Sequence, residues 1–431
     1  MVVANMIGTG IFTSLGFQVM PAPVGIPDAF AILFIWFLGG ILALCGAVSY
    51  GEVATTLKDS GGEYTFLSRL YHPLIGFTSG WVSLIAGFSA AVSALAIAAA
   101  NYALPVLADI SGGTADEVTR PAAISFILLV AAIQSGGIRM GSQFQNLITA
   151  FKLLLIVFIL CLPLFAMGEP ELASPEISFL PGPESWNTIF SLPFAGSLVF
   201  VMFSYSGWNA SSYITGNLEN PRKDLPFSLV AGTAIVALIY VLMNGVFMSI
   251  LPFSEIDGQI ALGNLTVARV FGFSFAKGFG FIFSFALLSG ISAMFIAGPR
   301  VAEQIGNDYP VFSFLKRKNA AGAPVNAIGL QTLISVCMVW FFQFEVILQY
   351  IEITLSLFCL LTVAGVFIIR HRNLAHEGTV KTALYPFTPL LFSGITLWMM
   401  AYFFIREPER LTGTAITLAS GAILYFLFRK K

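Results

Sequence analysis

The chain has 431 residues, of which 57% are hydrophobic and 10% are charged, and its formal net charge is -1. Soluble domains average about 25% charged residues, and a water-soluble chain of this length would divide into domains whose surfaces need charge. The composition therefore excludes an ordinary soluble protein and predicts a protein whose solvent is the lipid bilayer.

Apolar stretches of about 20 residues, the length that crosses the hydrocarbon core of a bilayer, recur along the whole chain. They predict an all-α integral membrane protein of about twelve transmembrane helices, at residues 1–20, 28–56, 74–104, 121–136, 143–167, 188–217, 226–250, 273–300, 325–344, 346–370, 385–405 and 411–428. The first stretch lacks the basic start and the cleavage site of a secretory signal peptide. Because a basic cytoplasmic lead-in is also missing, we expect the numbering to begin inside the first helix.

Lys and Arg residues are unevenly distributed between the predicted helices. If both termini are cytoplasmic, the inner segments hold most of these residues, and the outer segments hold Arg120, Arg269, Arg406 and Arg410. Cytoplasmic loops are enriched in positive charge, so the pattern predicts a multi-pass protein of the cytoplasmic membrane with both termini inside. The basic run at residues 316–318 follows from this topology and indicates no nucleic-acid partner.

The cysteines and histidines indicate no chemistry of their own. All four cysteines fall within predicted spans, where they are expected to serve as small packing residues: Cys45, Cys161, Cys337 and Cys359. The three histidines have no cysteine partners at metal-binding spacing. The sequence also lacks an HExxH motif and a Gly-x-Ser-x-Gly motif. We therefore expect neither an enzyme nor a bound metal or other cofactor.

Two predicted helices are interrupted in the middle of the membrane. The first contains Gly8 and Gly10, and the sixth contains Gly207 within residues 203–209. Irregular backbone at this depth is tolerated only where it is buried in protein or lines a cavity. The two breaks therefore predict one shared cavity. The alternative is that these glycines only allow close contacts between helices, as small residues often do in membranes.

The spacing of the two breaks favours an internal repeat. From Gly10 to the end of span 5, and from Gly207 to Arg370, the chain contains roughly 160 residues and five spans, as in inverted-repeat transporters. An odd number of spans makes the second unit enter the membrane from the opposite side. We therefore predict inverted repeats at residues 1–168 and 187–371, followed by two accessory helices within residues 384–431.

Short motifs recur over nearly the whole chain. They are Ile7-Gly8-Thr9-Gly10-Ile11-Phe12, Ser60-Gly61-Gly62-Glu63-Tyr64, Gly80-Trp81, Lys152, Tyr205-Ser206-Gly207-Trp208-Asn209, Asn220-Pro221-Arg222-Lys223, and Tyr240 with Asn244. In this order and spacing they resemble the amino acid–polyamine–organocation superfamily, and within it the L-type amino acid transporters and their bacterial serine/threonine and alanine exchanger relatives. The resemblance implies the leucine-transporter fold and transport of an amino acid by alternating access.

The physics of helix ends agrees with that resemblance. A helix that restarts after a break presents N–H groups that suit a carboxylate, which we predict for Thr9, Gly10 and Ile11. A helix that stops presents carbonyl groups that suit an ammonium group. The residues predicted for the ammonium group are Met6, Ile7, Phe203, Ser204 and Tyr205.

The remaining residues of the second break complete the predicted substrate site. Ser206 and Gly207 lie in the break itself, and Trp208 and Asn209 are expected to edge the pocket for the substrate side chain. The resemblance places the hydroxyl of Tyr240 near the carboxylate end of this site. The alternative for Tyr240 is an ordinary buried tyrosine with some other hydrogen-bond partner.

Lys152 stands within an apolar run, where an ionisable residue costs about 3 kcal/mol or more unless it has a partner or water. The resemblance places its ammonium group beside the first break, with Ser289 and Ser292 opposite, where sodium-coupled relatives bind a sodium ion. We therefore predict sodium-independent transport, with exchange and proton coupling both open. The alternative is that the side chain extends to the inner membrane surface.

Two acidic residues within predicted spans need an explanation. Glu52 is expected to meet basic groups on the inner side as a structural lock. Glu352 departs from the resemblance, which has a small residue there. It could bind a cationic substrate, carry a coupling proton, act in gating, or simply be hydrated. Glu352 thus keeps a cationic amino acid or polyamine exchanger open beside a carrier of small neutral L-amino acids. A non-transporting amino acid sensor of the same fold also stays open.

The expected partners are the amino acid substrate and membrane lipid. Animal L-type transporters bond to a heavy subunit through an outer cysteine between spans 3 and 4, but residues 105–120 contain none here. The resemblance therefore predicts a carrier without a disulfide-linked heavy subunit, and it leaves a monomer and a homodimer open.

Overall fold

The structure is a computed structural model that describes residues 2–19, 25–57, 62–166, 177–209 and 221–428, and the regular elements within these ranges are helical. In chain order they are α1 (Val2–Met6), α2 (Gly10–Gln18), α3 (Ala29–Leu57), α4 (Glu63–Leu70), α5 (Pro73–Val82), the π-helical η1 (Ser83–Ala90), α6 (Ala91–Ser111), α7 (Ala115–Ser135), α8 (Ile138–Leu160), α9 (Leu162–Ala166), α10 (Ser185–Ile189), α11 (Leu192–Tyr205), α12 (Pro221–Ile250), α13 (Phe253–Ile256), α14 (Leu262–Phe271), α15 (Phe273–Asp308), the 3₁₀ helix η4 (Pro310–Lys316), α16 (Val325–Phe341), α17 (Phe344–His371), α18 (Phe387–Arg406), the 3₁₀ helix η5 (Pro408–Leu411) and α19 (Thr412–Phe428).

The helices follow the predicted spans. In the described part of the chain, nine helical segments are long and apolar enough to cross a membrane, and α11 and α16 are shorter apolar helices. The interrupted pair α1 and α2 occupies the first predicted span. Together these segments confirm the all-α fold of about twelve spans. The fourth span begins earlier than predicted, at Ala115, and the eighth continues to Asp308. The end of the sixth predicted span, residues 210–217, lies outside the described residues.

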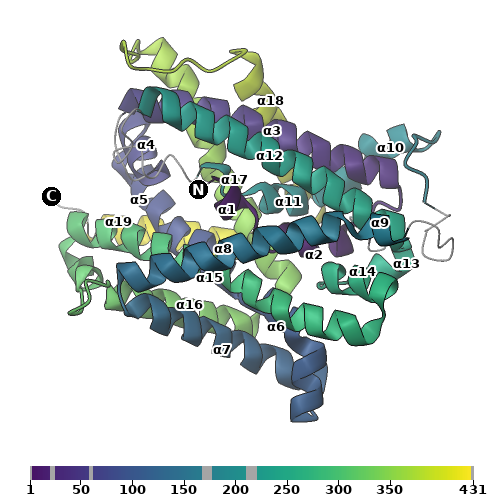
Figure 1. Cartoon of the computed structure of the whole chain (residues 1–431). Coiled ribbons are helices and arrows are strands. Elements are labelled where there is room, and N and C mark those ends of the chain that lie inside the picture. Colours follow the sequence, from purple (N-terminus) through teal and green to yellow (C-terminus); the bar gives the residue numbers. More distant parts are fainter. Residues whose placement is uncertain (1, 20–24, 58–61, 167–176, 210–220, 429–431) are drawn as a thin grey trace.

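The interrupted helices lie in the middle of the bundle (Figure 1). There α11 contacts α2, α3, α17 and α18, and α1 contacts α12. Glycines on α3 allow this close approach: a Cβ on Gly39 would lie 2.4 Å from Val201 Cγ1, and a Cβ on Gly46 would lie 2.7 Å from the Trp208 ring. Small residues serve helix packing in membranes in this way, so the glycines of α3 help to place the second break.

Local sequence explains where α11 begins and ends. The Ser191 side chain accepts a hydrogen bond from the Phe194 N–H group at 3.3 Å, and a proline occupies the first turn. This is a favourable helix start. The helix ends at Tyr205 because Gly207 adopts a φ of 95°, which side-chain-bearing residues rarely adopt. The glycine predicted to break the sixth span therefore does so.

Candidate functional site

The two breaks lie against each other. Residues 7–9 separate α1 from α2, and a Cβ on Gly10, at the start of α2, would lie only 2.5 Å from the Cα of Ser204 in α11. A Cβ on Gly207, just past α11, would lie 3.2 Å from the carbonyl oxygen of Asn5 in α1. The two breaks therefore lie at one crossing, while the cavity predicted between them stays a prediction. The backbones approach closely because glycine stands at each crossing point.

The first break exposes peptide groups of both kinds. The Gly8 N–H group donates to the Met6 carbonyl at 2.8 Å, and the Phe12 N–H group donates to the Thr9 carbonyl at 2.9 Å. The N–H groups in the first turn of a helix have no acceptor within that helix, and in α2 these include those of Gly10 and Ile11. The structure therefore places the predicted carboxylate-binding groups at the start of α2, and their role in binding stays a prediction.

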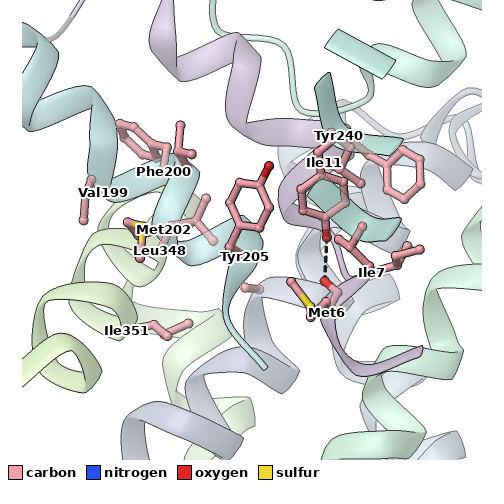
Figure 2. Packing of buried hydrophobic residues seen from close by; sticks show 14 of the residues in the cluster. Met6, Ile7, Ile11, Val199, Phe200, Met202, Tyr205, Tyr240, Leu348 and Ile351 are labelled. Atoms are coloured by element: carbon pink, nitrogen blue, oxygen red, sulfur yellow. Dashed lines mark hydrogen bonds between the residues drawn. The ribbon is translucent and has the colours of Figure 1, made fainter. Parts of the chain in front are cut away.

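Tyr240 joins the ends of α1 and α11. Its fully buried hydroxyl lies 2.7 Å from the carbonyl oxygen of Met6 (Figure 2) and 3.0 Å from that of Ser204. The hydroxyl is therefore on the carbonyl side of the site and not at the carboxylate end, where we expected it. It has one proton to donate, so it bonds one carbonyl at a time. Both carbonyls belong to residues predicted to bind the substrate ammonium group, and that role stays a prediction.

Lys152, which belongs to α8, bonds the main chain of the first break. Its side chain is 1% exposed, and its ammonium group donates to the carbonyl of Ile7. The ammonium group thus lies beside the break, as the resemblance implied, and the alternative in which it extends to the membrane surface is wrong. Ser289 donates within its own helix to Ala286 at 2.7 Å, and Ser292 accepts from Gln134 at 2.7 Å. Neither of these two bonds involves Lys152.

The aromatic residues of the second break turn toward α3. The Tyr205 hydroxyl donates to the Trp36 carbonyl at 2.9 Å. The Trp208 ring contacts the Tyr50 ring at a centroid distance of 4.7 Å and occupies the space that Gly46 leaves. In this conformation the Trp208 ring therefore packs against α3, where Gly46 leaves room for it, and does not edge a side-chain pocket. The predicted role of Tyr205, binding the substrate ammonium group, depends on its main-chain carbonyl and not on this hydroxyl.

The other predicted residues of α11 use their polar atoms locally. The Phe203 carbonyl accepts the Ser206 N–H group at 3.0 Å, so one predicted ammonium-binding carbonyl is already bonded within the turn. The Ser204 hydroxyl lies 2.9 Å from the hydroxyl of Ser14 in α2. Ser14 was not singled out from the sequence, although a serine within an apolar helix is the kind of signal that could have indicated it. This pair links the two broken helices directly.

Asn209 is held by an acidic residue from another helix. Its side-chain amide donates to Oε1 of Glu63 at 2.9 Å, and Glu63 is 3% exposed at the start of α4. From the sequence, Glu63 was named only as part of a motif. Its acidic side chain directly after a Gly-Gly pair, in a chain with few charges, was the available signal. Figure 2 shows buried hydrophobic side chains that pack around the two breaks, among them Met6, Ile11 and Phe200.

The two membrane-embedded acids differ in their surroundings. Glu52 forms a two-bond salt bridge with Arg370, at 3.0 and 2.9 Å, which links α3 to α17 as expected of a structural lock. Glu352 is 5% exposed and accepts a hydrogen bond from the Ser356 hydroxyl at 2.5 Å. The carboxylate therefore has little contact with bulk solvent in this conformation. Its predicted roles, in hydration, coupling, gating or cation binding, stay predictions.

The two ends of the site differ in exposure. Every residue of α2 is buried, and the Gly258 N–H group, in the loop before α14, donates to the carbonyl of Gly16 at 2.9 Å. On the other side of the break, Asn5, Gly8 and Ser206 are partly exposed. The molecule is therefore closed at the α2 end of the site and more open at the α1 end.

Two interrupted helices that cross inside a bundle of apolar spans, with peptide groups of both signs at the crossing, define a membrane carrier and not an enzyme. The chain belongs to the amino acid permease family, which it matches over residues 1–428. This confirms the resemblance to the amino acid–polyamine–organocation superfamily. In the described part of the chain, no cluster of three or more His, Cys, Asp or Glu residues could hold a metal ion.

Individual relatives are similar to the chain over almost its whole length. The b(0,+)-type amino acid transporter 1 of Mus musculus is 28% identical over 99% of this chain and 85% of its own. Serine/threonine exchanger SteT of Bacillus subtilis (strain 168) is 25% identical over 100% of this chain and 95% of its own. The cystine/glutamate transporter of Homo sapiens is 28% identical over 99% of this chain and 83% of its own.

Proposed function

We propose that this protein carries small neutral L-amino acids across the cytoplasmic membrane by alternating access, by exchange or coupled to protons, without sodium. The observation that carries the proposal is the crossing of the two breaks, where a Cβ on Gly10 would lie 2.5 Å from the Cα of Ser204. Main-chain N–H groups suit a carboxylate and main-chain carbonyls suit an ammonium group. One crossing point therefore offers partners for both ends of an α-amino acid.

Sodium independence is supported by Lys152. Its ammonium group lies on the Ile7 carbonyl of the first break and is 1% exposed. A fixed cation on that carbonyl connects the broken helix to α8 without a bound ion. Replacing an ion by a side chain also removes the coupling that the ion would provide, so the driving force must come from a counter-substrate or from protons.

The repeat division, residues 1–168 and 187–371 with accessory helices in 384–431, is supported by two segments that connect spans. Between the second and third spans, α4 lies against the residues that follow the second break, through Glu63 and Asn209. Between the seventh and eighth spans, the loop before α14 lies against α2, which follows the first break. Each unit thus contacts the other in the corresponding way, as inverted repeats do.

Both termini are proposed to be cytoplasmic, because the basic residues at 316–318 and 370–372 are expected at the inner membrane surface. The protein is proposed to act without a disulfide-linked heavy subunit, since residues 105–120 contain no cysteine. A monomer and a homodimer both fit this arrangement.

Counterflow in proteoliposomes tests the proposal. Purified protein is reconstituted with unlabelled serine inside, and uptake of labelled serine is measured in sodium buffer and in choline buffer at two pH values. We expect uptake to require internal amino acid or an inward proton gradient and to be equal in the two buffers. Strict dependence on sodium would reject the sodium-independent mechanism, and binding without counterflow would favour a sensor.

A cationic amino acid or polyamine exchanger is the second candidate, and the buried Glu352 favours it. A buried carboxylate is a costly group that a cationic substrate would stabilise. The same proteoliposomes, given a panel of unlabelled amino acids and polyamines as competitors, separate the two. Competition only by arginine, lysine or polyamines would replace the neutral substrate, whereas competition by serine, threonine and alanine supports it.

A further inference from the structure

Glu63 collects hydrogen bonds from three other parts of the chain. Its Oε1 atom accepts from the Asn209 amide at 2.9 Å, from the Tyr50 hydroxyl at 2.5 Å and from the Cys359 thiol at 3.5 Å. Tyr50 belongs to α3 and Cys359 to α17, while Asn209 follows the second break. One buried carboxylate therefore fixes the residue beside the break relative to α3, α4 and α17.

The charge of Glu63 determines how Asn209 is oriented. An ionised carboxylate only accepts hydrogen bonds, so the Asn209 group that faces it is the NH₂ group and not the carbonyl. Three donors around one oxygen atom favour the ionised form, and so does its place in the first turn of α4, at the positive end of that helix. A hydrogen bond to a charged group is stronger than one between neutral groups.

We propose that Glu63 is a positioning residue of the substrate site and that it acts through Asn209. The inference rests on the proposed function, in which Asn209 contributes to the substrate pocket. Glu63 fixes the NH₂ group of the Asn209 side chain. As long as this hydrogen bond holds, the Asn209 amide keeps the same orientation toward the pocket throughout the transport cycle. The geometry of the pocket is thus set from α4, outside the two broken helices.

An exchange of donor and acceptor tests this proposal. Asn209→Asp places two carboxylates together, and like charges at this distance cannot both ionise without a large cost. Glu63→Gln in the same chain supplies an amide that donates to the carboxylate introduced at position 209, so the double variant restores a charged hydrogen bond with its direction reversed. Glu63→Gln alone keeps an oxygen acceptor for Asn209 and Tyr50 and removes the charge.

We measure KM and the maximal rate of serine counterflow at pH 7.5 and pH 5.5. For Asn209→Asp we expect KM to rise about tenfold or more at pH 7.5, since a bond to a charged group is lost. This rise should be smaller at pH 5.5, where the two carboxylates can share a proton. We expect the double variant to return to within about threefold of Glu63→Gln at both pH values, with maximal rates little changed.

Tyr50→Phe combined with Asn209→Asp is the matched control. It removes the other strong donor to the same oxygen but supplies no amide, so it should not restore KM. Among the described titratable groups, Tyr50 on α3 and Cys359 on α17 donate hydrogen bonds to Glu63, and Glu352 on α17 lies near Cys359. Cys359 and Glu352 stay unchanged in all variants. Melting temperatures of the purified variants show whether each is folded.

The outcomes separate this proposal from the proposed function. Wild-type protein that exchanges serine, with Asn209→Asp unrescued by Glu63→Gln, overturns the positioning role alone. An equal rescue by Tyr50→Phe also overturns it, because the effect would then come from packing of α3. Wild-type protein that carries no amino acid of the panel overturns the proposed function and this inference with it.

Discussion

The two helix breaks meet at one place, but different charges hold them. At the first break, the ammonium group of Lys152 bonds the carbonyl of Ile7. At the second, the carboxylate of Glu63 bonds the amide of Asn209. Each buried charge faces a group of the opposite polarity, so each break is fixed by a side chain from a helix outside the broken pair. A buried charge is costly unless it is compensated, and here the broken backbone and its neighbours compensate it.

The two sides of the crossing also differ in how tightly they are enclosed. Beyond the first break α2 is buried along its length and is covered by the loop at Gly258. At the second break Ser206, Gly207 and Asn209 are partly exposed. Alternating access needs one side of the site to close while the other opens. The α2 end is therefore the more enclosed end of the crossing in this conformation, and the following variants test how each break is held.

The largest effect is expected where the two breaks touch. Gly10→Ala would place a Cβ 2.5 Å from the Cα of Ser204, which is main chain and cannot rotate away. The crossing must open, and overpacking of this kind costs about 3 kcal/mol or more. We expect serine counterflow to fall about 100-fold or more. Gly8→Ala is the matched control, because its nearest atom is Met6 O at 3.9 Å, and it should retain most activity. Equal losses of counterflow in the two variants would contradict the close contact between Gly10 and Ser204 at the crossing.

The second-largest effect is expected when the positive charge at the first break is removed. Lys152→Met leaves the Ile7 carbonyl without the ammonium group, and a bond to a charged group is worth about 1.5–3 kcal/mol. We expect counterflow to fall about 30-fold. Lys277→Met is the control, since this lysine pairs with Asp109 and is 29% exposed. If the Lys152 variant instead transports like the wild type, the first break does not depend on a fixed cation.

The sequence alone predicted what depends on local pattern. The length of apolar runs located the helices, and Gly8, Gly10 and Gly207 located the breaks, because backbone conformation and hydropathy are properties of short segments. The resemblance implied the position of Lys152, and the contact with Ile7 agrees with it. These features do not need the arrangement of distant helices to be known.

Other features depend on how helices cross, and the sequence did not reveal them. The Trp208 ring lies on α3 because Gly46 leaves room for it, and nothing near residue 208 in the sequence indicates that glycine. Tyr240 reaches the carbonyl groups of Met6 and Ser204 because α12 passes beside the ends of α1 and α11. The partner of Asn209 is 146 residues away. Contacts of this range are set by tertiary packing.

The third prediction concerns the group that bonds both breaks. Tyr240→Phe leaves the carbonyls of Met6 and Ser204 without their hydroxyl donor, and an unpaired buried acceptor costs about 1–3 kcal/mol. We expect KM for serine to change about tenfold. Tyr102→Phe is the control, because this buried hydroxyl accepts from the Gly263 N–H group in α14 and lies away from the breaks. A larger effect in the Tyr102 variant would show that Tyr240 has no special role.

The smallest effect is expected at Glu352, which lies outside both breaks on α17. Glu352→Gln keeps the shape of the side chain and an acceptor for the Ser356 hydroxyl, while it removes a carboxylate whose burial is costly when ionised. If the substrate is neutral and Glu352 carries no coupling proton, serine counterflow at pH 7.5 should stay within about threefold of the wild type, and its pH dependence should be unchanged. Ser356→Ala is the control for loss of the hydrogen bond alone. A loss of pH dependence in Glu352→Gln, with Ser356→Ala unaffected, would instead assign the coupling proton to Glu352. The charge of Glu352 would then change during transport, whereas the charges of Lys152 and Glu63 at the two breaks would stay fixed.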